Sequence, residues 1–479
     1  VRLQIAGDLV GDRQDAIATG FFALGPSYNS DGGDPDSVAQ AKAETLSDRL
    51  DTLGRGLLGL TLACARCHEH KFDPLPQQDY YSLAGVFNNS TLHEQPLVDD
   101  AIVKTYNERQ QAIRDFDKRI KDREKQFRDN KASTNADNKK ELDQWKSEVA
   151  ELRKTAPAKY DFAHTLRDSG NGTMKIAIRG NLRKPGEPAP RRFLRILAGD
   201  DAALFAAGSG RRELAQAIAD SANPLTSRVF VNRVWMHHFG KALVRTPSNF
   251  GALGEKPTHP ELLDWLTASF IESDHSIKTL HRTILMSATW QMSSLFEESA
   301  FQIDGDNRLL WRMNPRRLEA ESWRDSLLSV TGELDLKSGG PPVEQVESSR
   351  RTLYFKVSRN GDVFRTDEFL RLFDFPLMRA TIDKRPTSIV PQQFLFLLNS
   401  PFMGDRAKAL TRRVHREAET DEARIHRVCQ LLYQRPASEE EIEIGLAYLA
   451  SGESGTNGLT LWEQYTQVLL GANEFMYVR

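Results

Sequence analysis

The chain has 479 residues, a formal net charge of −2 and only three cysteines. This length allows two to four domains with large buried cores. The balanced charge argues against recruitment of nucleic acid or anionic lipid by a global field. The sequence also contains no run of 18 apolar residues, so we expect no transmembrane segment.

The chain begins with Val1-Arg2-Leu3-Gln4, which lacks an initiator Met and the charged and apolar regions of a signal peptide. We therefore expect a processed chain, or one whose beginning lies upstream of Val1.

Residues 1–98 are predicted to form one domain around the stretch Cys64-Ala65-Arg66-Cys67-His68. The apolar pattern before it predicts a helix from about Ser37 to Ala63. The spacing C-x-x-C-H is the attachment signature of c-type haem, in which two thiols bind one porphyrin covalently. Cys64 and Cys67 are thus the candidate thioether residues, and His68 is the candidate proximal iron ligand.

Two other interpretations of this stretch remain open. A zinc site would use Cys64, Cys67, His68 and His70, but structural zinc usually takes two separated ligand pairs. A thioredoxin-like redox pair would follow a strand, whereas the preceding residues favour a helix. For His70 we favour a supporting or surface role.

Residues 99–172 carry a different pattern, in which apolar residues recur at helical spacing among charges of both signs. This pattern predicts an antiparallel coiled-coil hairpin that turns near residues 130–138 and protrudes as a structural arm. The apolar positions are Tyr106, Ile113, Ile120 and Phe127 on the first helix, and Leu142, Trp145, Val149 and Leu152 on the second.

A short strand over Met174–Gly180 and a Pro-rich connector over Pro185–Pro190 occupy residues 173–200. The remainder, 201–479, is predicted to be a large helical domain with minor β structure. Its helices include one opened by Asn223-Pro224 that runs to about Phe239, and one that begins at Val390-Pro391.

The helix ending near Phe239 combines a largely apolar surface with Arg228, Arg233 and the run Met236-His237-His238. Buried Arg and His side chains need partners. In a functional interpretation, Arg228 and Arg233 contact the haem propionates, and Met236, His237 or His238 supplies the distal iron ligand. In a structural interpretation, the same residues form an inter-helix network with acidic partners such as Glu261 or Asp264.

Several segments together resemble a known family. Gly59–Pro74, with its C-x-x-C-H stretch, and Asp79–Leu83 are similar to the cytochrome-c-like domain of large planctomycete and verrucomicrobial proteins. Residues 223–240, 258–266 and 373–376 are similar to the C-terminal helical domain of unknown function that accompanies it. The resemblance implies covalent haem c and export from the bacterial cytoplasm, with the signal sequence upstream of Val1, but no settled activity.

The leading hypothesis is therefore a mainly α, periplasmic or otherwise extracytoplasmic c-type haem protein that transfers electrons to a redox partner protein. One alternative is a haem-dependent oxidoreductase that acts on an exported substrate such as a glycan. Another is a non-redox scaffold with a structural haem or metal. The sequence contains no P-loop, dinucleotide fingerprint, H-E-x-x-H or G-x-S-x-G motif.

Overall fold

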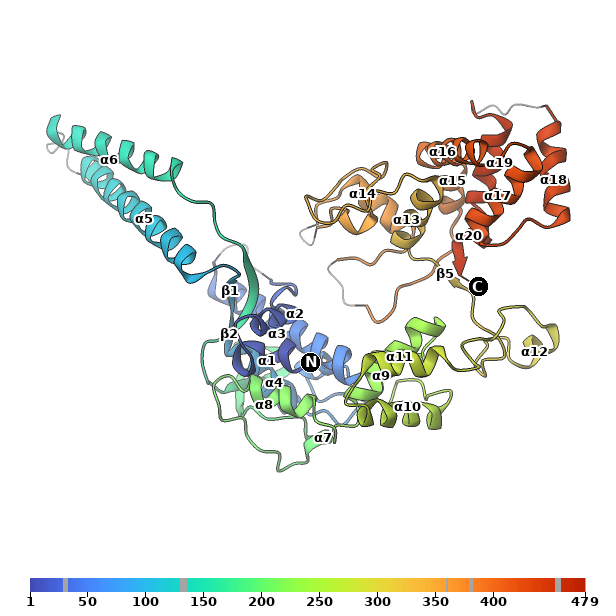
Figure 1. Ribbon diagram of the computed structural model, residues 1–479. Helices are drawn as coiled ribbons and strands as arrows, with labels where there is room; N and C mark the ends of the chain where they lie inside the picture. Colours follow the sequence, from blue (N-terminus) through green and yellow to red (C-terminus); the bar gives the residue numbers. More distant parts are fainter. Residues whose placement is uncertain (29–32, 130–135, 359–360, 379–381, 453–457, 479) are drawn as a thin grey trace. The chain divides into compact units, whose positions relative to one another are not determined.

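A computed structural model describes the chain except for residues 29–32, 130–135, 359–360, 379–381, 453–457 and 479. The described residues are mainly helical and carry small two-stranded antiparallel sheets, so the predicted mainly α fold with minor β structure is confirmed (Figure 1). Within these residues, no helix has both the length and the apolar character needed to cross a bilayer. They form two compact units, which are described separately: unit 1 comprises Val1–Leu53 and Leu62–Asn223, and unit 2 comprises Gly54–Thr61 and Pro224–Arg479.

The core of unit 1 contains the packed helices α3 (Pro35–Leu53) and α4 (Gln77–Asn88). Leu46, Leu50 and Leu53 recur at helical spacing on α3 and are buried, as is Phe87 on α4. The other helices of unit 1 are α1 (Arg2–Val10), η1 (Asp15–Thr19), α2 (Gly20–Ala23), η3 (Leu62–Arg66), α5 (Asp100–Asp129), α6 (Ala136–Lys154), η5 (Ile178–Gly180), α7 (Arg195–Ala198) and α8 (Arg211–Ile218).

The helix predicted over Ser37–Ala63 is wrong in its C-terminal part. The α-helix ends at Leu53 and is followed by a π-helical turn, η2 (Gly54–Leu58). Gly59 then adopts a left-handed φ of +63°, and a Cβ at this position would lie 2.8 Å from the Phe250 ring. The apolar periodicity that suggested a continuing helix instead reflects the burial of Leu58, Leu60 and Leu62 in non-α backbone.

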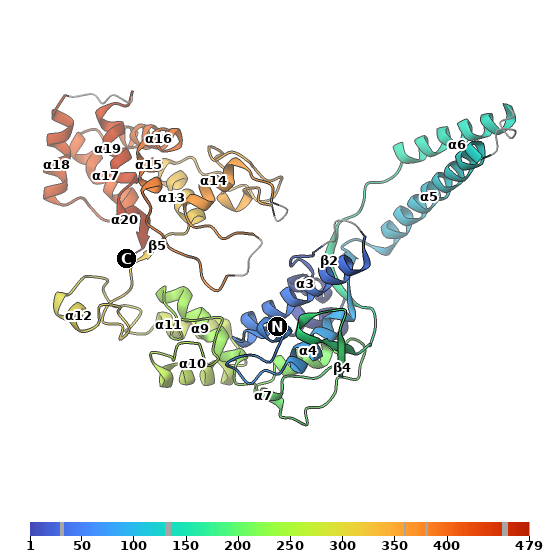
Figure 2. The ribbon, with the colours of Figure 1, turned by 180° about the vertical axis from the view of Figure 1, so that it is seen from behind.

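Two strands enclose the helical hairpin of unit 1. The strands β1 (Ser90–Pro96) and β2 (Phe162–Asp168) pair antiparallel, with Ser90 opposite Asp168 and Pro96 opposite Phe162. A second sheet joins β3 (Met174–Ala177), where a strand was predicted, to β4 (Pro185–Ala189), which is labelled in Figure 2.

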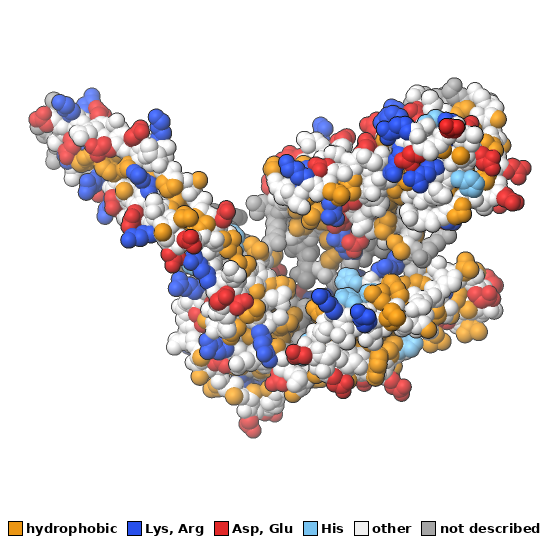
Figure 3. Space-filling view, in the orientation of Figure 1, with side chains coloured by type: hydrophobic (Ala, Val, Ile, Leu, Met, Phe, Trp, Pro, Cys, Tyr) orange, Lys and Arg blue, Asp and Glu red, His pale blue; other side chains and the backbone are white. Residues whose placement is uncertain are grey.

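Helices α5 and α6 pair in antiparallel orientation, as the heptad-like pattern predicted. Asp117 binds Arg153 at 2.7 Å, and Glu124 binds Lys146 at 2.8 Å, so ascending positions on α5 meet descending positions on α6. Figure 3 shows Lys and Arg interspersed with Asp and Glu along this pair. The predicted turn falls largely on residues 130–135, outside the described residues, and the role of the hairpin as an arm stays a prediction.

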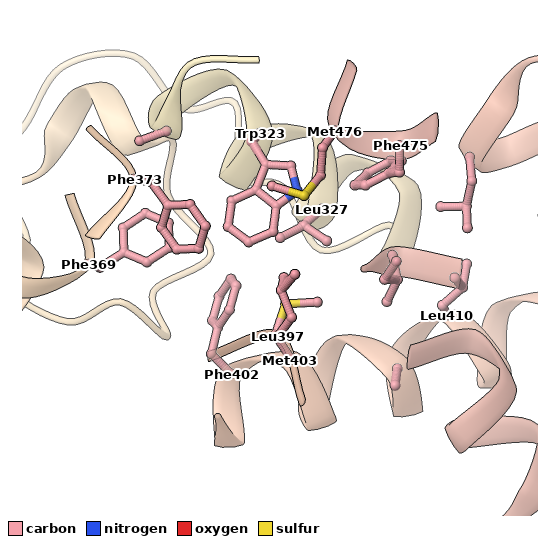
Figure 4. Packing of buried hydrophobic residues seen from close by; sticks show 14 of the residues in the cluster. Trp323, Leu327, Phe369, Phe373, Leu397, Phe402, Met403, Leu410, Phe475 and Met476 are labelled. Carbon is pink, nitrogen blue, oxygen red and sulfur yellow. The ribbon is translucent and has the colours of Figure 1, made fainter. Parts of the chain in front are cut away.

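Unit 2 contains two larger apolar clusters. One joins α9 (Thr226–Phe239), α10 (Pro260–Glu272) and α11 (Ile277–Leu285). In the other, Trp323 of α13 (Ala320–Thr331) packs against Phe373, the residue that follows α14 (Arg365–Leu372). The centroids of the two rings are 4.5 Å apart (Figure 4). Pairing of β5 (Arg316–Arg317) with β6 (Tyr477–Val478) ties the end of the chain to this unit.

The helix predicted to begin at Pro391 is confirmed as α15. The helix predicted to open at Asn223-Pro224 and end near Phe239 is present as α9, but its predicted start is wrong, because α9 begins at Thr226 with Leu225 as its N-cap. The remaining helices of unit 2 are α12 (Glu298–Ile303), η6 (Thr352–Tyr354), α15 (Pro391–Asn399), α16 (Pro401–Glu417), α17 (Asp421–Tyr433), α18 (Glu439–Ala450), α19 (Leu461–Leu470) and α20 (Asn473–Met476).

Candidate functional site

The C-x-x-C-H residues lie on a short, exposed segment of unit 1. Cys64 belongs to the 3-10 helix η3, and Cys67 and His68 occupy the turn that follows. All three are exposed, and neither thiol is in a disulfide. The third cysteine, Cys429, is buried in unit 2, where burial raises the pKa of its thiol to about 11. The two thiols of the motif are therefore accessible, whereas Cys429 is protected as an inert core residue.

Hydrogen bonds fix this segment to the start of α4. The carbonyl of Arg66 accepts from Nε2 of Gln77 at 2.8 Å and from the hydroxyl of Tyr81 at 3.2 Å. The carboxylate of Glu69 accepts from the backbone N–H of Gln77 at 3.1 Å, which satisfies a free donor at the helix N-terminus. Arg66 itself binds Glu44 on α3 at 3.0 Å. The motif backbone is thus held by α3 and α4 while its reactive side chains stay exposed.

One ring nitrogen of His68 is already committed to the protein. Nδ1 lies 2.6 Å from the carbonyl oxygen of Glu69. Because a carbonyl can only accept, Nδ1 must carry the proton, and the lone pair of the neutral ring is then on Nε2. Metal-ligating histidines are commonly oriented in this way, by donating their other N–H to a carbonyl. The geometry of His68 therefore fits an iron ligand that binds through Nε2.

His70 holds the loop after the motif together. Its Nδ1 accepts from the backbone N–H of Asp73 at 2.8 Å, and its side chain is only 6% exposed. The backbone N–H of His70 in turn donates to the carbonyl of Leu75 at 3.0 Å. Within the described part of the chain, no three His, Cys, Asp or Glu side chains are grouped as a metal site would require.

Gly180 is a residue of this site that sequence reasoning missed. It has a left-handed φ of +75°, and a Cβ at its position would lie 2.5 Å from the sulfur of Cys67. Glycine is therefore required by both the backbone angle and the approach of the thiol. A glycine at the end of the predicted strand was visible in the sequence, but nothing local indicated that it meets Cys67.

The two candidate propionate ligands on α9 already have partners within unit 2. Arg228 binds Asp264 of α10 at 2.6 Å, which is the ion pair named in the structural interpretation. Nη2 of Arg233 donates to the carbonyl of Arg55 at 2.8 Å and to the hydroxyl of Ser248 at 3.0 Å. Burial lowers the pKa of Arg233, but hydrogen bonds hold its guanidinium in place.

The candidate distal ligands also lie on α9. His237 is exposed, Met236 is half-buried, and Nε2 of His238 lies 2.7 Å from Nδ1 of His281 on α11. Burial and the neighbouring His281 lower the pKa of His238. These residues belong to unit 2, whereas Cys64, Cys67 and His68 belong to unit 1. The assignment of a distal ligand from α9 stays a prediction.

Comparison with known proteins finds two family models that match parts of the chain. The family model PSD1, described as a protein of unknown function (DUF1553), matches residues 210–449. The family model PSCyt2, also described as a protein of unknown function (DUF1549), matches residues 1–92. Both domains are typical of planctomycete and verrucomicrobial proteins. No curated protein and no solved structure matches the chain.

Proposed function

The chain belongs to the PSD1 family of proteins of unknown function (DUF1553), and from that premise we propose that it is an exported c-type haem protein that transfers electrons. The observation that carries the proposal is the state of the motif in unit 1: two exposed thiols, and an imidazole whose Nδ1 is bound to a carbonyl 2.6 Å away. These groups are the ones that covalent attachment and axial ligation require.

Each residue of the motif has a distinct role in this proposal. Cys64 and Cys67 would hold the haem through thioether bonds, because each S–H can add across a vinyl group without an external oxidant. His68 would hold the metal through Nε2, and the Glu69 carbonyl orients its ring. The bound haem would supply reversible one-electron chemistry.

The exposure of the motif supports electron transfer to a partner protein. Cys64, Cys67 and His68 all lie at the surface of unit 1, on a backbone held by Gln77 and Tyr81. A group attached there would have an edge that a redox partner could approach, and little of the supporting segment would need to reorganise. We therefore infer a protein partner of the redox type, and export to a compartment in which covalent haem attachment takes place.

The attachment is tested by haem staining after denaturing electrophoresis. The full chain, produced in a bacterium that exports it and attaches haem c, should retain peroxidase-active haem on the gel. The double variant Cys64→Ala/Cys67→Ala should lose the stain, whereas Cys429→Ala should keep it because that thiol is buried in the core of unit 2 and is not part of the motif. A colourless wild-type protein with both motif thiols unmodified by mass spectrometry would refute the proposal.

The electron-transfer role is tested separately by spectroscopy of the haem-loaded protein. A six-coordinate, low-spin spectrum that changes on addition of dithionite and is unaffected by CO is expected of an electron carrier. CO binding without any change of the protein would favour the oxidoreductase instead. Replacement of Met236, His237 and His238 one at a time by Ala then asks whether α9 supplies the sixth ligand, because loss of that ligand would convert the iron to a high-spin form.

A further inference from the structure

Unit 1 contains a cavity of about 480 Å³. The described residues that line it do not include those of the C-x-x-C-H segment. It lies among the residues after α2, one face of α3, the end of α4 and the start of β1. Leu46 and Phe87 are fully or nearly fully buried and form an apolar part of its wall, and polar side chains also line it: Ser27, Tyr28, Lys42, Thr45 and Ser90. Its volume is within the range of pockets that hold small organic ligands.

The polar group that distinguishes this cavity is the guanidinium of Arg49. Arg49 lines the cavity and is only 7% exposed, yet no hydrogen bond or ion pair joins it to any of the residues that the structure describes. Burial lowers the pKa of the Arg49 guanidinium, and the negative charge of the neighbouring Asp48, which acts to raise that pKa, does not offset the effect of burial. A buried cation without a partner is costly, so its presence in a cavity points to an anionic ligand.

Arg211, another buried arginine of unit 1, differs from Arg49 in having its charge matched. Arg211 is fully buried and binds Asp8 at 2.7 Å and Asp168 at 2.6 Å. Arg211 and Arg49 are close enough for their charges to interact unfavourably. The fold therefore neutralises the guanidinium of Arg211 with two carboxylates and leaves Arg49 lining the cavity.

We propose that this cavity binds a carboxylate carried on a small apolar body, with the carboxylate on Arg49 and the apolar body against Leu46 and Phe87. A guanidinium pairs with a carboxylate through two parallel hydrogen bonds. Lys42, which is exposed and also lines the cavity, adds a second positive charge. A single buried guanidinium beside the apolar side chains of Leu46 and Phe87 matches a monoanion with an apolar part better than it matches a small, fully hydrated dianion such as phosphate.

The carboxylate has two conceivable sources, a diffusible organic acid or a propionate of the haem proposed above. The binding of a carboxylate to Arg49 does not depend on the haem assignment, and an experiment can distinguish the two sources. The haem-loaded chain and the haem-free Cys64→Ala/Cys67→Ala variant are titrated by calorimetry with benzoate, with the neutral benzamide and with inorganic phosphate.

We expect benzoate to bind and benzamide and phosphate to bind at least tenfold more weakly. Binding to both forms of the chain identifies a diffusible acid, and binding to the haem-free form alone identifies a propionate. Arg49→Gln should weaken benzoate binding at least tenfold, and Arg128→Gln, which removes an exposed charge from α5, should leave the affinity unchanged. Equal binding of benzoate and benzamide, or no benzoate binding to either form, would overturn the proposal.

A second measurement keeps the test decisive if Arg49 is needed for folding. Because Arg49 is buried and has no partner among the described residues, Arg49→Gln should keep or raise the midpoint of thermal unfolding without ligand. Benzoate should raise the midpoint of the wild type and not that of the variant. A marked fall of the midpoint in Arg49→Gln would assign Arg49 a structural role and overturn the proposal.

Discussion

The sulfur of Cys67 occupies the space that a side chain at Gly180 would need. A Cβ at Gly180 would lie 2.5 Å from Sγ and 3.4 Å from Cβ of Cys67. The two residues are far apart in the sequence, so the fold brings a specific glycine against one of the two candidate attachment thiols. This contact makes Gly180 a positioning residue for Cys67.

Gly180→Ala should lower the fraction of chains that carry covalent haem. The new methyl group must displace the Cys67 thiol, and the left-handed backbone adds strain, for a combined cost of about 1–3 kcal/mol in unfolding free energy. Gly332→Ala is the control, because Gly332 has a left-handed φ of +78° with a ψ of 20°, and nothing lies within 4 Å of its Cβ position. It should show the strain alone, about 1 kcal/mol, with normal haem content. Mass spectrometry of the intact chains gives the haem-loaded fraction, and equal fractions in the two variants would contradict this prediction.

Gln77→Glu should destabilise unit 1, because Nε2 of Gln77 donates to the carbonyls of Arg66 at 2.8 Å and Ala177 at 3.2 Å. A carboxylate cannot donate, so both carbonyls would face a negative charge, and we expect a loss of about 2 kcal/mol. Gln78→Glu is the control, since the side-chain oxygen of Gln78 accepts from Arg195 and a carboxylate preserves that role. Urea unfolding followed by circular dichroism measures both. A Gln77→Glu variant as stable as Gln78→Glu would show that these hydrogen bonds do not hold the motif.

The Arg228–Asp264 pair should contribute little to stability, because the two side chains are 35% and 59% exposed. A double-mutant cycle with Arg228→Gln and Asp264→Asn should give a coupling free energy of about 0.5 kcal/mol. If Arg228 serves only this pair, the reduction potential of the haem should be the same in all four proteins of the cycle. A shift that follows Arg228 and not Asp264 would instead restore the propionate role that the sequence suggested.

Unit 2 should lose stability in acid through Glu441. Hydrogen bonds from Arg435 lower the pKa of Glu441 to about 2, below the value of 4.5 expected in the unfolded chain. A lowered carboxyl pKa stabilises the folded state above about pH 4.5, and that stabilisation disappears as the pH falls toward 2. Because the pair is partly exposed, we discount its contribution for solvent screening to about 1 kcal/mol.

The acid effect is measured by urea unfolding of the wild type and Glu441→Gln at pH 7 and pH 3. The variant should be the less stable protein at pH 7, and the difference should shrink at pH 3. Glu443→Gln, at an exposed position of the same helix α18, should match the wild type at both pH values. A difference between wild type and Glu441→Gln that is independent of pH would argue against a titrating Glu441.

The sequence by itself determined the features that depend on residues close together in the chain. The spacing of Cys64, Cys67 and His68 fixes the candidate attachment chemistry, and Pro and apolar periodicity located α9, α15 and the paired helices α5 and α6. Local spacing suffices there because helical hydrogen bonds and side-chain stripes repeat every few residues. The same reasoning failed beyond Leu53, where apolar residues remain buried but glycines allow the backbone to leave the α-helix.

Only the tertiary structure decided which distant groups meet. It placed Gly180 against Cys67, gave Arg228 to Asp264 and His238 to His281, and left Arg49 facing a cavity without a partner among the described residues. These outcomes depend on how whole elements pack, because the cost of burying a charge is decided by the groups that surround it in space. No local sequence pattern distinguishes Arg49 from Arg211. Arg211 differs because the fold brings it together with the carboxylates of Asp8 and Asp168, which lie far from it in the sequence.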